Sequence, residues 1–223
     1  MKTGHSTTWM VTYGSLLTAV LAFFLLLVQK AESEAESTFR LADKLKSQYY
    51  VDLLAEKERL NLSWLHIENA GQRGIKILIP SQIDNQSLFK SGGDRIEPKF
   101  IPFLSNISRL INGLNLDKVY EINQKHIAKL RKVDKDLKVK IRVEGHTDAT
   151  RLMEGSEYED NWALSTARAR NVLNLIQSDL SLPSNFFSLS GYGPFHPLRD
   201  VSNFDENRRV EIYLDVQIVD YNL

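Results

Sequence analysis

Cysteine is absent from the 223 residues of the chain, and neither charge is in excess, with 28 Lys and Arg against 28 Asp and Glu. The lack of cysteine excludes disulfide frameworks, cysteine-ligated zinc, thiol catalysis and a lipid anchor on an N-terminal cysteine. The lack of excess positive charge leaves no general field for nucleic acid, so we expect no nucleic-acid partner. The length allows one medium-sized domain with an appendage, which excludes a large multidomain enzyme.

Charged side chains are also missing from one continuous stretch near the N-terminus, Trp9 to Val28. Twenty residues at about 1.5 Å rise cross the ~30 Å hydrocarbon core of a bilayer, whereas a cleaved signal peptide has a shorter apolar run. We therefore predict a retained transmembrane helix over residues 9–28. Lys2 precedes it and an acidic stretch, Glu32 to Glu36, follows it. The positive-inside rule then puts residues 1–8 in the cytoplasm and the rest of the chain outside it.

Small and polar residues gather inside this apolar stretch, at Thr12, Gly14, Ser15 and Thr18. They favour either a face that packs against a partner helix or hydroxyls that bond back to the preceding turn of their own helix. The next segment, residues 29–73, has apolar residues at three- and four-residue steps, which predicts a helical linker. The pattern fits a coiled stalk in a dimer and an amphipathic connector packed on its own domain equally well.

Strand and helix patterns alternate through the remaining segment, residues 74–223. This alternation predicts an α/β (α+β) sandwich, in which helices cover one face of a mixed sheet. We expect strands at 74–80, 138–143, 187–190 and 210–219, and helices at 98–111, 116–132 and 163–176.

Chemically active residues gather in two places within this domain. Thr147 and Asp148 follow the strand at 138–143, and open α/β sheets commonly bind ligands at the carboxyl ends of strands. Asn161, Leu164 and Arg168 share one face of the helix that comes next. Asp148 and Arg168 can clasp a zwitterion, with the carboxylate binding an ammonium group and the guanidinium binding a carboxylate. The alternative is a salt bridge between the two that holds the loop.

Catalysis, a metal site and a cofactor are not expected. His146, Asp148 and Ser165 lack the G-x-S-x-G pattern of a nucleophile elbow, and a serine in a helix-opening motif is more often a cap. A metal site made by His146 with Asp148 and Glu144 is not expected either, because alternate residues on a strand point to opposite faces.

Four segments in order, VEGHTD, NWALSTARA, GYG and NRRVEI, resemble the C-terminal peptidoglycan-binding domain shared by OmpA, Pal and MotB. The resemblance covers about residues 74–216 and implies an OmpA-C-like mixed sheet. It also implies a pocket for the free zwitterionic end of diaminopimelate in the peptidoglycan stem peptide. The positions that match the pocket of the family are Asp148, Asn161, Leu164, Arg168 and Arg208. We expect Thr147, which directly precedes Asp148, to belong to the same site.

The stretch from Trp9 to Phe24 looks like the single membrane helix of MotB, the stator subunit of the flagellar motor. MotB proteins carry an ion-binding Asp where this chain has Ser15, whose hydroxyl does not ionise near neutral pH. The resemblance implies a homodimeric, single-pass protein of the bacterial inner membrane with a periplasmic C-terminal domain.

Such a protein tethers a complex with a MotA-like multispan partner to the cell wall, here without itself carrying the driving ion. Two alternatives stay open at this stage. One is a passive peptidoglycan anchor or accessory of a secretion or envelope machine without an ion channel. The other is an ion path that uses Ser15 or Thr18 in an unfamiliar way.

Overall fold

A computed structural model describes residues 8–90, 92–198 and 204–221 of the chain. The predicted cytoplasmic segment, residues 1–8, lies outside this range except for Thr8. The chain divides after Leu41 into two compact units, which are considered separately. Helix α1 extends from Thr8 to Arg59 and contributes to both.

The first unit contains a helical segment, Trp9–Lys30, that is long and apolar enough to cross a membrane. The hydroxyls of Ser15 and Thr18 in this segment bond to their own helix. The hydroxyl of Ser15 donates to the Thr12 carbonyl at 2.9 Å, and that of Thr18 donates to the carbonyls of Gly14 and Ser15 at 3.0 and 2.9 Å. Of the two interpretations of these residues, bonding to the preceding turn accounts for both hydroxyls without a partner helix.

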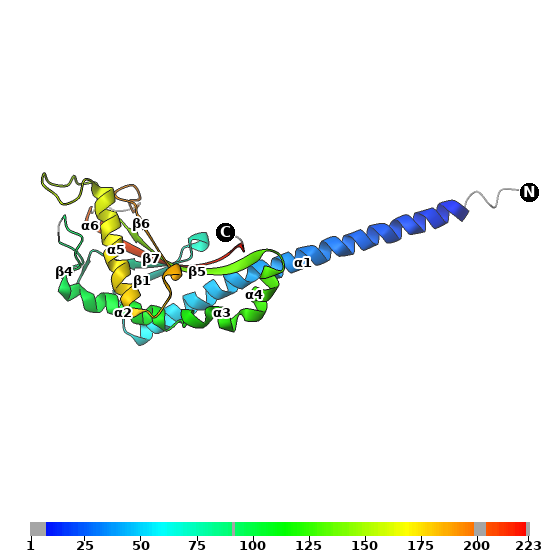
Figure 1. Cartoon of the computed structure of the whole chain (residues 1–223), viewed down its shortest axis with the longest axis horizontal. Coiled ribbons are helices and arrows are strands. Elements are labelled where there is room, and N and C mark those ends of the chain that lie inside the picture. The colour runs from blue at the N-terminus through cyan, green and yellow to red at the C-terminus, as the bar shows by residue number, and fades with distance from the viewer. Residues whose placement is uncertain (1–7, 91, 199–203, 222–223) are drawn as a thin grey trace, which may run out of the picture. The chain divides into compact units, whose positions relative to one another are not determined.

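The second unit is built on a five-stranded sheet in the order β1-β2-β7-β5-β6 (Figure 1). The strands of this sheet are β1 (His66–Asn69), β2 (Ile75–Ile79), β5 (Lys135–Gly145), β6 (Phe187–Gly191) and β7 (Val210–Asp220). Strands β5 and β6 run parallel and the other neighbours antiparallel, so the sheet is mixed. A short hairpin, β3 (Gln82–Ile83) with β4 (Gln86–Ser87), lies outside it.

Helices pack against this sheet and complete the predicted α/β sandwich, which is confirmed. The helices of the second unit are α2 (Ile101–Asn112), α3 (Val119–Ile122), α4 (Gln124–Arg131), α5 (Asn161–Asp179) and α6 (Phe204–Asn207). Helix α5 packs on β5 and β6, α2 packs on α5, and α4 packs on β5 (Figure 1). Buried Leu104, Ile107 and Ile111, at three- and four-residue spacing, give α2 the apolar face that this packing requires, and buried Phe100 extends this face into the preceding 3-10 turn.

Three features differ from the sequence-based expectations. Strand β1 pairs with β2, so the sheet begins before residue 74, inside the segment predicted as linker. The helix predicted over residues 116–132 is divided into a 3-10 turn, α3 and α4, with Asn115 in the left-handed conformation at its start. The end of α1 belongs to the second unit, where Tyr49 and Leu53 are buried, which favours the packed connector over the free stalk for residues 42–59.

A pair of glycines allows α5 to lie directly on the sheet. Gly145 of β5 is in register with Gly191 of β6. A Cβ atom on Gly145 would lie 2.0 Å from the carbonyl oxygen of Ser165, and one on Gly191 would lie 2.0 Å from Oγ1 of Thr166. Only residues without a side chain therefore permit this contact between the helix and the two strand ends.

We expect Gly145→Ala to lower the free energy of unfolding by at least about 1–3 kcal/mol, because the added methyl group meets backbone that cannot move independently. Urea unfolding of the purified chain in mild detergent measures the change. Gly113→Ala is the matched control, since its Cβ would approach no atom closer than 3.4 Å and its backbone is helical. Equal stability of the two variants would contradict the assigned role of this contact.

Candidate functional site

A cavity of about 700 Å³ opens where β5 ends and α5 begins. All six residues that the sequence predicted for a binding site line this cavity: Thr147, Asp148, Asn161, Leu164, Arg168 and Arg208. They come from the loop after β5, the first turns of α5 and the segment that precedes β7. The structure thus brings together residues from a stretch of the chain in which the first, Thr147, and the last, Arg208, are 61 positions apart.

Asp148 is 6% exposed and is held in a fixed orientation. Its Oδ2 accepts a hydrogen bond of 2.8 Å from Nη1 of Arg208, and its Oδ1 accepts one of 3.0 Å from the backbone N–H of Thr150. Arg208 also forms an ion pair of 2.5 Å with Asp205. The cation paired with Asp148 is therefore Arg208, whereas the alternative derived from the sequence paired it with Arg168.

Arg168 is anchored by the loop that precedes α2. Its Nε donates to the carbonyl of Gly93 at 2.9 Å and its Nη2 to the carbonyl of Lys90 at 3.4 Å. The guanidinium carbon lies 4.9 Å from the centre of the Phe89 ring. Burial, together with the positive charge of Arg208, lowers the pKa of Arg168 to about 10, so the group stays protonated at neutral pH.

The other predicted residues shape the entrance to the helix. The Asn161 side-chain amide donates to the carbonyl of Thr150 at 2.8 Å and joins α5 to the loop after β5. Asp160 caps α5 by accepting a hydrogen bond of 2.8 Å from the N–H of Ala163. The hydroxyl of Thr147 is buried and has no hydrogen-bond partner among the described residues.

Sequence reasoning missed several residues of the cavity wall, because they lie in loops with no periodic pattern. They include Phe89 and Lys90 before α2, and Arg151, Glu154 and Glu157 after β5. The Gly93 and Lys90 carbonyls that hold Arg168 offer no signal in the sequence, since any residue supplies a carbonyl.

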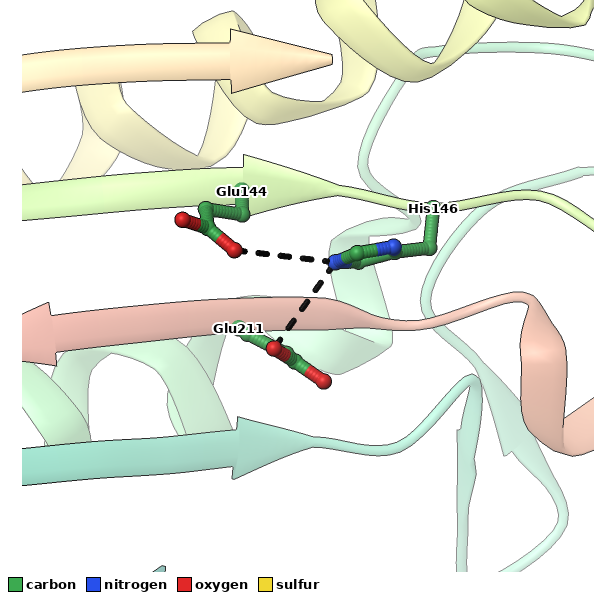
Figure 2. Close-up of side chains that lie close together, drawn as sticks. All are labelled: Glu144, His146 and Glu211. Atoms are coloured by element: carbon green, nitrogen blue, oxygen red, sulfur yellow. Dashed lines mark ion pairs between the residues drawn. The ribbon is translucent and has the colours of Figure 1, made fainter. Parts of the chain in front are cut away.

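Three titratable side chains, Glu144, His146 and Glu211, meet in the protein interior beside this cavity (Figure 2). The sequence argument against a metal site is wrong for Glu144 and His146, which are two residues apart and point to the same side. Glu211 was missed, because its position opposite Glu144 follows from the pairing of β5 with β7. Burial, with the positive charge of Arg209, lowers the pKa of His146 to about 4.

Comparison with known proteins identifies related sequences for both ends of the chain. Residues 111–211 match the OmpA family, and residues 1–48 match the family described as membrane MotB of the proton-channel complex MotA/MotB. Motility protein B of Bacillus subtilis (strain 168) is 35% identical over 77 residues, which cover 33% of this chain and 29% of that protein. These matches confirm the resemblance to the OmpA, Pal and MotB family and, within it, to MotB.

Two longer matches cover most of the chain. The uncharacterized protein YtxE of Bacillus subtilis (strain 168) is 26% identical over 242 residues, which cover 94% of this chain and 88% of that protein. A crystal structure of a MotB-like protein from Desulfovibrio vulgaris superposes with a TM-score of 0.57 and 21% identity, covering 79% of this chain and 99% of the other. At 21% identity, the match to the Desulfovibrio vulgaris structure shows similarity of fold alone.

We expect His146 to make the protein less stable as the pH falls. Its pKa is about 4 when folded and about 6.5 when unfolded, so the unfolded chain binds more protons between these values. The contribution of His146 to the free energy of unfolding should fall by about 2 kcal/mol between pH 7 and pH 5.

Urea unfolding at both pH values, in buffer containing a chelator, measures this loss for the unmodified chain and for His146→Asn. The variant should show a shallower dependence on pH, whereas His126→Asn, on the surface of α4, should behave like the unmodified chain. An unchanged slope in His146→Asn would contradict a buried neutral imidazole.

Proposed function

We propose that this chain is a membrane-anchored peptidoglycan-binding protein of the MotB type, which tethers a membrane complex to the cell wall and is not an enzyme. The observation that carries the proposal is the cavity at the end of β5, where Asp148, Arg168 and Arg208 lie together. The matches to the OmpA family and to MotB support it.

The charges of this cavity suit the free end of diaminopimelate, which carries one ammonium and one carboxylate group. Asp148 offers the carboxylate for the ammonium. Two guanidinium groups, those of Arg168 and Arg208, are close enough for the charge of one to lower the pKa of the other, and such a pair favours an anionic ligand group. Asn161, Leu164 and Thr147, whose hydroxyl has no partner among the residues that the structure describes, complete the pocket that we propose for the stem peptide.

Asp148→Ala and Arg168→Ala should each weaken binding to purified diaminopimelate-containing sacculi by roughly 10- to 150-fold, because each removes a hydrogen-bonded charge from the ligand. Cosedimentation of the full chain in mild detergent measures retention, and free diaminopimelate should compete with it. The matched control is Arg170→Ala, which removes an exposed arginine two residues after Arg168 that does not line the cavity. Retention of both pocket variants at the level of this control would exclude the assignment.

For the N-terminal part we propose a single pass through the inner membrane, with the N-terminus in the cytoplasm and the C-terminal domain in the periplasm. The apolar segment Trp9–Lys30 and the match of residues 1–48 to membrane MotB support this arrangement. We propose a homodimer that associates with a MotA-like multispan protein. The chain would not carry the driving ion, since the hydroxyl of Ser15 bonds to the carbonyl of Thr12 and does not ionise near neutral pH.

Purification of the full chain in mild detergent should recover a MotA-like multispan protein, identified by mass spectrometry. Gly14→Leu should abolish this recovery, because a Cβ at Gly14 meets no described atom within 4 Å beyond the adjacent residues and the nearby backbone of its own helix, so the side chain would obstruct a partner helix. Leu25→Met, an apolar exchange in the same helix, is the control. Recovery of a homodimer alone, or of secretion or envelope components, would instead support the passive anchor.

A further inference from the structure

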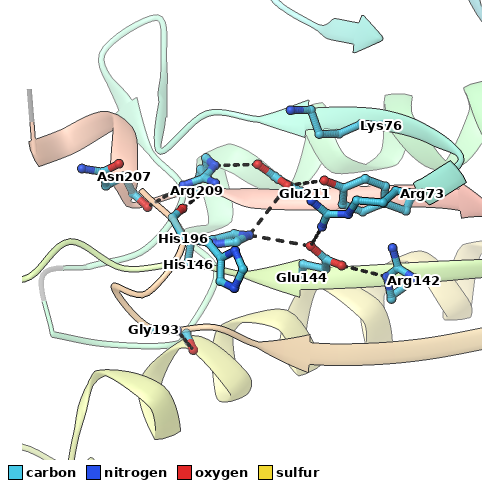
Figure 3. A network of polar contacts seen from close by, with 12 residues as sticks. Arg73, Lys76, Arg142, Glu144, His146, Gly193, His196, Asn207, Arg209 and Glu211 are labelled. Carbon is cyan, nitrogen blue, oxygen red and sulfur yellow. Dashed lines mark hydrogen bonds and ion pairs between the residues drawn. The ribbon is translucent and has the colours of Figure 1, made fainter. Parts of the chain in front are cut away.

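The cluster of Glu144, His146 and Glu211 lies on the sheet face that also carries Arg142 (Figure 3). The Tyr213 hydroxyl donates to Glu211 on the same face. The three residues are 0%, 3% and 3% exposed, respectively. Glu144 and Glu211 are direct neighbours in the pairing of β5 with β7. Like charges opposite each other in a sheet are destabilising, so this pair needs cations around it.

The imidazole of His146 is buried without a hydrogen bond. Neither of its ring nitrogens has a partner in the described part of the chain. Nε2 points between the two carboxylates, 4.0 Å from Oε2 of Glu144 and 3.8 Å from Oε2 of Glu211, which is too far for hydrogen bonds. The ring stacks on Tyr192, with 5.5 Å between centres and 15° between planes, so its direction is fixed. A buried polar atom aimed at two acceptors that it does not reach indicates that something binds between them.

We propose that Nε2 of His146, Oε2 of Glu144 and Oε2 of Glu211 form a binding site for a divalent transition-metal ion, with zinc as the best fit. The three ligand atoms all lie within 4.8 Å of one another. Tetrahedral zinc has ligands at about 2.0–2.2 Å, which separates ligand atoms by about 3.4 Å. Binding of the ion would therefore shorten the distances from Nε2 to the two carboxylate oxygens, 4.0 and 3.8 Å, by roughly half an ångström, and the separation of ligand atoms that is largest, at most 4.8 Å, by up to about 1.4 Å. The imidazole favours zinc over magnesium and calcium, which prefer oxygen ligands.

Two of the surrounding arginines, Arg142 and Arg209, bind the carboxylate oxygens that face away from His146. Oε1 of Glu144 accepts a hydrogen bond of 2.8 Å from Nε of Arg142, and Oε1 of Glu211 accepts one of 2.7 Å from Nε of Arg209. These bonds leave the Oε2 atoms directed toward His146 and orient them as outer partners of metal ligands commonly do.

Arg73 and the proposed ion would compete for the same carboxylate oxygen, Oε2 of Glu144. Its Nη2 donates to Oε2 of Glu144 at 2.7 Å, and its side chain is 52% exposed. This guanidinium can move into solvent and let a divalent cation replace its charge. Oε2 of Glu211 accepts a hydrogen bond from the Tyr213 hydroxyl, a neutral donor that does not oppose a cation. Arg73 and the ion would thus exclude each other from Oε2 of Glu144.

An ion at this site would tie the end of β5 to the beginning of β7. The backbone N–H of His146 already donates to the carbonyl of Arg209 at 3.0 Å. Thr147, which follows His146, and Arg208, which precedes Arg209, both line the cavity. The bound ion would stabilise this junction. The inference goes beyond the proposed function, because the site requires no peptidoglycan ligand.

Calorimetric titration of the full chain in mild detergent with zinc chloride, after removal of metals by a chelator, tests the proposal. We expect one zinc ion per chain and a higher unfolding temperature with zinc. His146→Asn and Glu211→Gln should weaken zinc binding at least tenfold. Arg73→Ala should strengthen it at least threefold, a gain that a misfolded variant cannot produce.

The surface pair of His66 and Glu68 provides the control, since His66 Nε2 lies 3.4 Å from the Glu68 carboxylate and is exposed. His66→Ala should leave zinc binding unchanged. Loss of binding in this variant, or equal binding in His146→Asn and the unmodified chain, would overturn the proposal. Sacculus retention measured in chelator reports on the proposed function separately, so failure of one does not imply failure of the other.

Discussion

The close contact between α5 and the ends of β5 and β6 determines the geometry of the candidate site. Gly145 and Gly191 face each other in the sheet, and the backbone and side chains at Ser165 and Thr166 lie where their Cβ atoms would be. Asp148 lies three residues after Gly145, and the first turns of α5 carry the residues that face it. One contact therefore sets the distance between the loop and the helix that form the cavity.

Ser165 extends the effect of this contact to a third segment. Its hydroxyl accepts a hydrogen bond of 2.9 Å from the N–H of Gly193 and donates one of 2.8 Å to the carbonyl of Trp162. The Gly193 carbonyl in turn accepts from the N–H of Thr147 at 3.0 Å. The loop after β6 is thus joined to the start of α5 by one of these hydrogen bonds and to the loop after β5 by another. In this environment the serine holds backbone segments together. The expectation that it caps the helix is wrong, because Asp160 is the cap of α5 and Ser165 lies inside the helix.

Periodicity in the sequence predicted the elements with long regular patterns, such as α2, α5, β5 and β7. It failed where the pattern is short or interrupted. Strand β1 has only four residues and no apolar alternation, and the helix predicted over residues 116–132 is broken at Asn123, whose side chain bonds to the carbonyl of Val119 at 2.8 Å. The resemblance to a known family identified the cavity residues, but the pairing of Asp148 with Arg208 and the position of Glu211 required the register of β5 and β7.

The two consecutive arginines before β7 connect the cavity to the buried cluster. Arg208 binds Asp148 at the cavity, whereas Arg209 is 6% exposed and binds Glu211. Burying charges is costly unless they are paired. Arg208 pairs with Asp148 and Asp205 at the cavity, and Arg209 pairs with Glu211 in the cluster. A tether of the kind proposed for this chain needs a rigid ligand-binding end and an apolar membrane helix, and it needs no ionisable group in that helix. By this reasoning, Ser15 is compatible with anchoring even though it is not compatible with carrying an ion on its own side chain.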